Sequence, residues 1–141
     1  MYKRKSWKEK LLVDKKPEVK TIDKKFADIP AGSKMLIPTP IVVDDYIRHI
    51  APGRTSSISK MRRDLALEYG ADYTCPITSG IFIRIAAEAA FENYQKEKSI
   101  SKITPFWRII SPGSPTANKL TFGQGLLRKL QQKENLSWKK S

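Results

Sequence analysis

Few side chains in this chain could act as a nucleophile, a general base or a metal ligand. The sequence holds one cysteine, Cys75, and one histidine, His49. A thiol is a strong nucleophile at neutral pH only when a neighbouring base or positive charge favours its thiolate. His49 is distant from Cys75 in the sequence, and one cysteine with one histidine gives neither a disulfide nor a thiol-rich metal site. We therefore expect no metal ion and no other cofactor.

Cys75 is the one residue through which covalent chemistry remains open. It directly precedes Pro76, where we expect a long helix to begin, since proline is tolerated at an early helical position. The positive end of that helix would favour the thiolate. Pro76 and Ile77 instead suggest a partly buried thiol with a structural role. Both alternatives, a structural cysteine and a thiol enzyme that uses Cys75, stay open at this point.

The apolar segment 103–110, with the sequence ITPFWRII, lies between two regions of helical pattern. Pro105 lacks an amide donor and holds Thr104 out of the helical region. The isoleucines and the tryptophan favour a strand. The SPGS sequence that follows is typical of a turn. We therefore predict a buried strand over 103–110 and a β wing over 112–120.

The remaining elements are predicted from apolar spacing, caps and breakers. The Met35–Val43 segment is apolar but contains two prolines, so we expect an extended lead-in rather than a central strand. Helices are predicted from Asp44 or Asp45 to about residue 50, from Ser57 or Ser59 to about Tyr69, from Pro76 to about Lys96, and from Phe122 to Glu134. This order is typical of a winged helix-turn-helix, so the predicted fold class is mainly α with a small β wing.

Three segments are expected along the chain. Residues 1–34 form a basic N-terminal arm, in which Ser6 and Glu9 have the spacing of a helix capping box. We expect Trp7 to hold this arm on the domain, with a solvated extension as the alternative. Residues 35–134 form the domain itself, and residues 135–141 form a basic tail.

The overall composition suits one globular domain with a polyanionic partner. The chain has 141 residues, of which 40% are hydrophobic and 29% charged, and its formal net charge is +13. Such an excess of positive charge is typical of nucleic-acid binding, although a solubilising surface is the alternative. No stretch approaches the roughly 20 apolar residues of a membrane span. The Met1–Lys10 segment lacks the apolar core of a signal peptide, so we expect a cytoplasmic protein without a membrane partner.

The segment around Pro105 resembles the active-site segment of the DNA repair alkyltransferases, the methylguanine-DNA methyltransferase family. The family pattern is Ile-Pro-Cys-His-Arg-Val-Val, and Pro105 and the Arg108–Ile110 segment fall on matching places. Phe106 stands where the family has its acceptor cysteine, and Trp107 where it has histidine. Phenylalanine has no nucleophile, and an indole has no basic lone pair. We therefore expect no alkyl transfer through this motif.

Other fragments of the chain resemble the same family in the same order. The 50–53 sequence IAPG is similar to the family's Ile-Pro-x-Gly, and Ser57 stands at the start of the next helix without the tyrosine that follows it in the family. Placing Gly80 on the family's helix glycine puts Ile77 where the family has its base-propping arginine. The 130–134 segment resembles Leu-Leu-x-x-Glu, so Glu134 takes the place of the orienting glutamate and is expected to have nothing to orient.

The closest resemblance is to a divergent branch of the family that lacks the acceptor cysteine. The segments 35–40, 75–80 and 104–108 resemble that branch. Related alkyltransferase-like proteins bind alkylated DNA and pass the lesion to other repair proteins. The resemblance therefore implies a non-catalytic protein that binds double-stranded DNA, alkylated or plain, with repair proteins as further partners.

Candidate site residues form two groups. The DNA contacts are expected among polar and basic residues near the helix-turn-helix: Arg54, Ser57, Lys60, Arg62, Arg63, Thr78, Ser79, Arg84, Arg108 and Lys119. Arg108 has a structural role as its alternative. The degenerate active site comprises Pro105, Phe106, Trp107 and Glu134. Its two aromatic rings either stack on an extruded base or fill the former pocket as core.

A protein-interaction module that has kept the fold without nucleic-acid binding is the alternative function. It differs from the DNA-binding hypothesis in predicting acidic residues that interrupt the basic face and no affinity for duplex DNA at physiological salt. The two hypotheses share the expectation of a non-catalytic protein.

Overall fold

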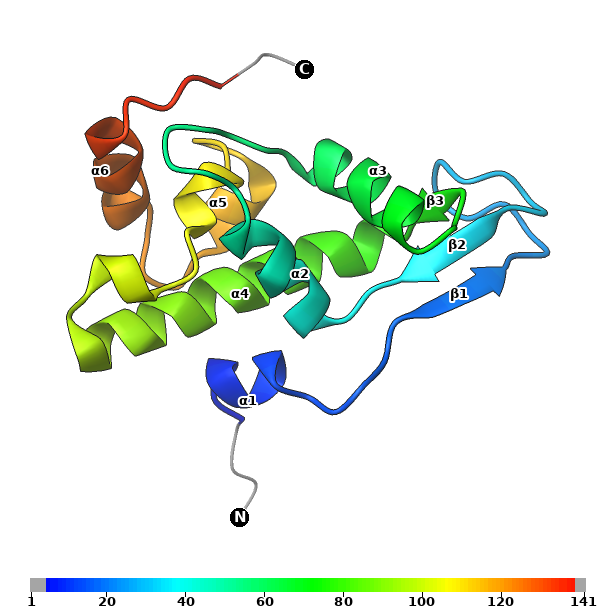
Figure 1. The fold of residues 1–141 in the computed structure, drawn as a ribbon, viewed down its shortest axis with the longest axis horizontal. Helices are drawn as coiled ribbons and strands as arrows, with labels where there is room; N and C mark the ends of the chain where they lie inside the picture. Colours follow the sequence, from blue (N-terminus) through cyan, green and yellow to red (C-terminus); the bar gives the residue numbers. More distant parts are fainter. Residues whose placement is uncertain (1–4, 139–141) are drawn as a thin grey trace.

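The computed structural model describes residues 5–138, and this part of the chain is mainly helical with one small sheet (Figure 1). The mainly α class with a small β component is therefore as predicted. The helices are α1 (Trp7–Leu11), α2 (Pro40–Arg48), α3 (Ile58–Glu68), α4 (Pro76–Glu97), α5 (Pro115–Lys119) and α6 (Gly125–Lys133), with 3₁₀ turns η1 (Ile100–Lys102) and η2 (Phe106–Arg108). The strands are β1 (Glu18–Thr21), β2 (Lys34–Ile37) and β3 (Tyr73–Thr74).

The long helix α4 is the element on which the others are assembled. Figure 1 shows it running along the length of the molecule, and α1, α2, α3, α5 and η2 all contact it. Pro76 occupies its first turn as predicted, and Lys98 ends it in the left-handed conformation. The alanine-rich middle of the helix, around Ala86 and Ala90, is buried. Small side chains there let neighbouring elements approach closely.

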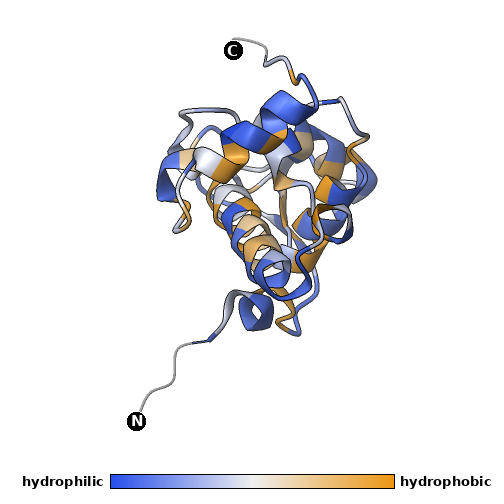
Figure 2. Ribbon diagram, turned by 90° about the vertical axis from the view of Figure 1, so that its left-hand side faces the viewer, coloured by the Kyte–Doolittle hydropathy of each residue, from blue (hydrophilic) through white to orange (hydrophobic). Residues whose placement is uncertain are grey.

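The hydrophobic core lies between α4 and the elements that surround it. Its buried members come from every region of the domain, and the larger ones are Leu36, Ile47, Met61, Leu65, Ile83, Phe106, Trp107, Ile110 and Leu127. In Figure 2 the helices carry hydrophobic residues on some sides and hydrophilic residues on others. This amphipathic pattern is what allows one face of each helix to be buried while the other stays hydrated.

The sheet is formed by the N-terminal part of the chain and not by a wing. β1 pairs antiparallel with β2, and β2 pairs parallel with β3. β2 is therefore a central strand, and the expectation of a mere lead-in over 35–43 was wrong. Pro38 follows the strand, so its missing amide interrupts no ladder. Pro40 opens α2 after the cap residue Thr39, which starts this helix several residues before the predicted position.

The predicted strand over 103–110 and the predicted wing over 112–120 were both wrong. Within 103–110 the amides bond to nearby carbonyls: Phe106 N–H donates to Thr104 and Arg108 N–H to Pro105. The segment is thus extended at first and then forms η2. In the second segment Ser114 caps α5, with Pro115 in the first turn. The apolar residues of 103–110 are buried as expected, but they pack against helices rather than pair with a strand.

The described part of the N-terminal arm lies against the rest of the chain. The predicted capping box is confirmed, since Ser6 and Glu9 bond reciprocally at the start of α1. The Glu92 carboxylate on α4 accepts hydrogen bonds from the amides of Trp7 and Lys8, each at 3.1 Å. Further along, β1 joins the sheet. Residues 1–4 of the arm and 139–141 of the predicted tail lie outside the described residues.

Among residues 5–138, no helix is long and apolar enough to cross a membrane.

A closed aromatic site and a candidate nucleic-acid interface

The Glu134 carboxylate is the centre of a hydrogen-bonded cluster that closes the degenerate active site. Trp107 donates its indole N–H to Glu134 Oε2 at 2.6 Å, and the Gly53 amide donates to Oε1 at 2.8 Å. Arg108 donates to both carboxylate oxygens at 2.9–3.2 Å and to the carbonyl oxygen of Ile50 at 2.9 Å. The expectation that Glu134 has nothing to orient was wrong, because it fixes the indole and the guanidinium together.

The surroundings of Glu134 hold it in the ionised form. Burial raises the pKa of this carboxyl, but hydrogen bonds from Arg108, the Gly53 amide and Trp107 outweigh burial and lower the pKa to about 2. The Arg108 side chain is only 13% exposed. The pair therefore joins the 50–53 loop, η2 and the end of α6 through partly buried, charge-assisted bonds.

The aromatic rings at this site fill the core. Phe106 is fully buried, and its ring meets those of Trp107 and Phe122 edge-on at centroid distances of 5.4 and 5.6 Å. Phe122 in turn stacks on Phe91 at 4.3 Å. Pro105 is buried as well. Of the two alternatives for the rings, this geometry favours core packing over stacking on an extruded base.

Three of the predicted DNA contacts have internal roles. Ser79 is fully buried, and its hydroxyl donates to the carbonyl oxygen of Cys75 at 2.7 Å. Arg62 donates to the carbonyl oxygen of Thr74 at 2.9 Å and makes a two-pronged contact with Asp28 at 3.1 and 3.3 Å. Arg108 is committed to Glu134. Ser79 is thus buried away from any DNA, Arg62 links α3 to neighbouring segments, and the contacts of Arg108 favour its structural alternative.

Other candidates are partly engaged within the protein. Lys60 Nζ lies 2.7 Å from Asp64 Oδ2, and Ser57 caps α3 by accepting from the Lys60 amide, as predicted. Arg84 Nε lies 3.7 Å from Glu88 Oε2, and the guanidinium lies over the Trp7 ring at 5.2 Å. Thr78 is half-buried.

The candidates left with exposed, unpaired charges are Arg54, Arg63 and Lys119. Each is exposed, and none forms an ion pair within the described part of the chain. They come from the α2–α3 connection, α3 and α5 respectively. Of the ten predicted contacts, these three are therefore the ones whose charge is both exposed and unpaired among residues 5–138.

The structure reveals an apolar surface on the α3–α4 pair that the sequence analysis missed. Ile77 and Ile81 lie one turn apart on α4 and are 56% and 51% exposed. Ile58 at the start of α3 is also exposed, and its Cδ1 atom approaches the Cβ position of Gly80 at 3.7 Å. We call these three residues the isoleucine patch. The i, i+4 spacing of Ile77 and Ile81 was the available signal, because it places the two side chains on one face of the helix.

Cys75 is buried in a small second cluster with Ile29 and Met35. Its amide donates to the carbonyl oxygen of Leu36 at 2.8 Å, which ties the start of α4 to β2. The surroundings are apolar, which supports the structural alternative for this thiol. Within residues 5–138, no three histidine, cysteine, aspartate or glutamate side chains gather as a metal site would require.

No protein-family model, curated protein or solved structure matches the chain. The resemblance to the DNA repair alkyltransferases thus stays a hypothesis, carried by the sequence fragments around Pro105, Ile50, Gly80 and Glu134.

Proposed function

We propose that this chain is a non-catalytic, alkyltransferase-like protein that binds duplex DNA, plain or alkylated, through the α3–α4 helix pair. The single observation that carries the proposal is the exposure of Ile77 and Ile81 near the start of α4, on a chain of net charge +13. In this proposal α3 and α4 form a helix-turn-helix pair. The protein would act in the cytoplasm and would recruit repair proteins.

Binding rather than catalysis follows from the closed aromatic site. Alkyl transfer requires a thiolate that the substrate can reach. Phe106 occupies the corresponding place and is fully buried, and the Trp107 indole is a donor already bonded to Glu134. The buried thiol of Cys75 lies in another cluster.

Electrostatic attraction supplies the affinity in this proposal. Few carboxylates neutralise the cations: within residues 5–138, six lysine or arginine side chains form ion pairs, namely Lys20, Arg48, Lys60, Arg62, Arg84 and Arg108. Arg54, in the connection before α3, and Arg63, in the middle of α3, are exposed and form no ion pair among the described residues. The first turn of α4 has no side-chain cap, so its amides and positive dipole end are further partners for phosphate.

The isoleucine patch favours a second candidate, a protein-interaction module. Exposed apolar side chains on adjacent helices are typical of protein–protein contacts. Apolar side chains also enter the minor groove in some DNA-binding proteins. The patch therefore fits both candidates, and only a binding measurement separates them.

A titration with plain and alkylated duplexes at two salt concentrations tests the proposal. The logarithm of the binding constant should fall with the logarithm of salt concentration, with a slope of about −0.9 for each phosphate neutralised. Replacing Arg54 and Arg63 together by glutamine should weaken binding and reduce the slope by up to about 2. Lys20→Gln on β1 is the matched control and should change neither quantity appreciably.

The isoleucine patch gives the second arm of the same experiment. Ile77→Asp places a negative charge on the proposed DNA-facing side of α4 and should weaken duplex binding, whereas Leu67→Asp, at an exposed position of α3, should do so less. Absence of duplex binding at physiological salt in the unchanged protein would reject the proposal in favour of the interaction module.

A further inference from the structure

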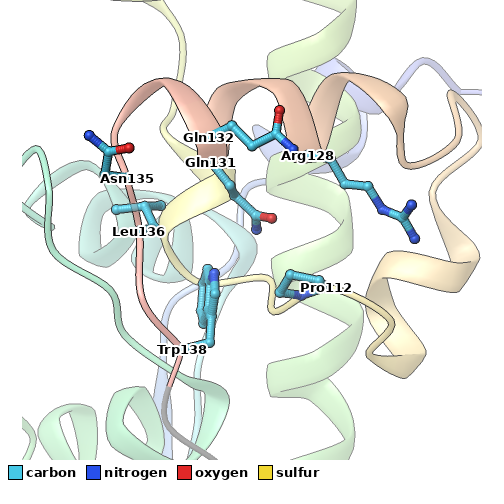
Figure 3. Close-up of a pocket in the computed structure, with 7 residues that line it drawn as sticks. All are labelled: Pro112, Arg128, Gln131, Gln132, Asn135, Leu136 and Trp138. Carbon is cyan, nitrogen blue, oxygen red and sulfur yellow. The ribbon is translucent and has the colours of Figure 1, made fainter.

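A cavity of about 580 Å³, wide open to solvent, lies between α6, the turn after η2 and the C-terminal segment (Figure 3). Its size is within the range of small-molecule sites. The lining residues that matter here are Pro112, Arg128, Gln131, Gln132, Asn135 and Trp138. None belongs to the α3–α4 pair, and none was a predicted site residue. The cavity therefore lies outside the α3–α4 pair, although the C-terminal segment beside it contacts Thr55, the neighbour of the proposed duplex contact Arg54.

The C-terminal segment is held in a defined path that brings Trp138 to this cavity. α6 ends at Lys133, and Asn135, two residues later, has a left-handed conformation with φ of 55°. The Leu136 amide then bonds back to the carbonyl oxygen of Gln131 at 3.1 Å, as at the end of many helices. Beyond it, Thr55 donates its hydroxyl to the carbonyl oxygen of Ser137 at 3.3 Å. The chain thus turns back beside α6 instead of continuing away from it.

The cavity has two apolar walls that suit a flat ring. In Figure 3 the indole of Trp138 and the ring of Pro112 stand on opposite sides of the hollow, with the Gln131 side chain above them. Aromatic side chains bind planar groups by stacking, and every nucleobase offers such a face. A proline ring provides a second apolar surface without a competing polar group.

One polar atom beside this slot, the carbonyl oxygen of Gln131, remains available for a ligand. Gln131 is buried, and its amide nitrogen donates to the carbonyl oxygens of Trp107 at 3.1 Å and Ile110 at 2.7 Å. Its amide nitrogen is thereby committed, which fixes the side chain and leaves its carbonyl oxygen as the acceptor. The indole nitrogen of Trp138 is buried without a hydrogen-bond partner among the described residues. Because this nitrogen has almost no accessible surface, the indole offers a ligand its ring face and not a hydrogen bond.

Arg128 supplies the positive charge at the edge of the cavity. Among residues 5–138 it forms no ion pair, whereas Arg108 and Arg62 are both committed to carboxylates. Figure 3 shows its guanidinium extending from α6 away from the two glutamine side chains. A guanidinium at this place suits a phosphate group, which it binds through parallel N–H donors. An apolar slot with a cation at its edge combines the two features of a nucleotide.

We propose that this cavity binds a single unpaired nucleotide, with the base between Trp138 and Pro112 and the phosphate on Arg128. Gln131 then meets the edge of the base through its carbonyl oxygen. Amide and guanidinium groups favour this ligand over a proline-rich peptide, which would need little more than the aromatic surface. The proposal does not rest on duplex binding by the α3–α4 pair.

Nuclear magnetic resonance of the full chain tests this site directly. The indole N–H resonances of the three tryptophans are assigned with Trp→Phe variants and followed during titration with dAMP, dGMP, dCMP and dTMP. Saturable movement of the Trp138 resonance, with the Trp7 resonance unmoved, is expected. Arg128→Gln should weaken mononucleotide binding at least fivefold while leaving binding of the uncharged nucleosides unchanged, and Lys133→Gln on the same helix should have no such effect.

Several results would overturn the proposal. Equal movement of the Trp138 resonance with inorganic phosphate would reduce the site to an anion contact. Movement with a polyproline peptide but not with mononucleotides would assign the slot to another class of partner. Absence of any saturable movement of the Trp138 resonance would show that the cavity binds no mononucleotide. Trp138→Ala, checked for folding by circular dichroism, should abolish mononucleotide binding while leaving the salt-dependent duplex binding in place, so the two proposals fail independently.

Discussion

At the scale of single residues, the Trp107 indole donates a hydrogen bond to Glu134 but has no basic nitrogen that the carboxylate could orient for catalysis. An indole donates one hydrogen bond and accepts none through its nitrogen. The same carboxylate also bonds Arg108 and the Gly53 amide. The cluster is therefore a structural joint between the 50–53 loop, η2 and α6, and its contribution to stability depends on the charge of Glu134.

The pH dependence of stability should report this charge. The pKa of Glu134 falls from its usual value of 4.5 to about 2 in the folded protein. A lowered folded-state pKa contributes stability that is present above the unfolded-state pKa and is lost as pH falls towards the folded-state value. As pH falls from 7 to 3, protonation of Glu134 should therefore lower the free energy of unfolding by about 2 kcal/mol.

Urea denaturation at pH 7 and pH 3 measures this loss, with Glu134→Gln as the comparison. The variant should be less stable at pH 7, since Arg108 loses its ion pair, and should lose about 2 kcal/mol less than the unchanged protein between the two pH values. Glu68→Gln, an exposed position of α3, serves as the control and should leave the pH dependence as it is. If Glu134→Gln and the unchanged protein lost the same free energy of unfolding between pH 7 and pH 3, Glu134 would not be the source of the pH dependence.

Replacing Phe106 distinguishes core packing from an open base pocket, because the two arrangements predict different losses of stability. A fully buried phenylalanine that contacts Trp107 and Phe122 should cost about 3–5 kcal/mol on replacement by alanine. The matched control is Leu67→Ala at a site 81% exposed, where the change should be within about 0.5 kcal/mol. Chemical denaturation measures both. A loss below about 1 kcal/mol for Phe106→Ala would indicate a site that is open rather than packed.

At the scale of elements, α1 is a short helix whose position depends on a distant carboxylate. Glu92 on α4 accepts from the amides of Trp7 and Lys8, which would otherwise be unpaired at the first turn of α1. The negative charge also suits the positive end of the helix dipole. A helix of five residues has little stability of its own, so these bonds and the packing of Trp7 hold it in place.

Glu92→Ala should release α1 without unfolding the domain. Hydrogen exchange of the α1 amides should accelerate at least tenfold, while the free energy of global unfolding falls by about 1 kcal/mol, the usual cost of a lost helix cap. Glu97→Ala at the exposed end of α4 is the control and should leave α1 protected. Unchanged exchange in α1 after Glu92→Ala would show that the packing of Trp7 alone fixes the helix.

The elements that sequence predicted well are those with local signals at both ends. Ser57 and Gly70 bound α3, and Pro76 marks the start of α4, because caps and breakers act within one turn of the residues they affect. The local signals of the 103–110 segment, Pro105 and the SPGS turn after it, indicate an extended start and an end but not what the segment packs against. Its β-branched and aromatic residues fit any buried surface, and whether they pair with a strand depends on elements far away in the chain. The helices α4 and α6 supply that surface instead.

For the candidate site, too, the sequence predicts local features but not the contacts that side chains make with distant parts of the chain. The basic residues could be located by sequence, but their partners could not: Asp28 is 34 positions from Arg62, and Glu134 is 26 positions from Arg108. Each pairing turns a supposed DNA contact into an internal link. The isoleucine patch escaped prediction for the opposite reason. Apolar spacing on a helix indicates a shared face, but it does not say whether that face is covered.

At the scale of the whole molecule, positive charge should be the main electrostatic influence on stability. The net charge of +13 makes the compact state self-repulsive. Salt screens this repulsion, and it also weakens exposed ion pairs such as the one between Lys60 and Asp64. Exposed pairs are worth only about 0.3–0.5 kcal/mol each on a helix, and few occur among the described residues, so the loss of repulsion should dominate.

Raising sodium chloride from 20 to 200 mM should therefore stabilise the folded chain, by an amount on the order of 1 kcal/mol. Urea denaturation at the two concentrations measures the change. Replacing the neighbouring exposed residues Lys15 and Lys16 by glutamine removes part of the repulsion, so this variant should gain less from salt than the unchanged protein. A fall in stability with added salt would mean that ion pairs outweigh repulsion. The excess charge would then be compensated within the fold and would no longer support a polyanionic partner.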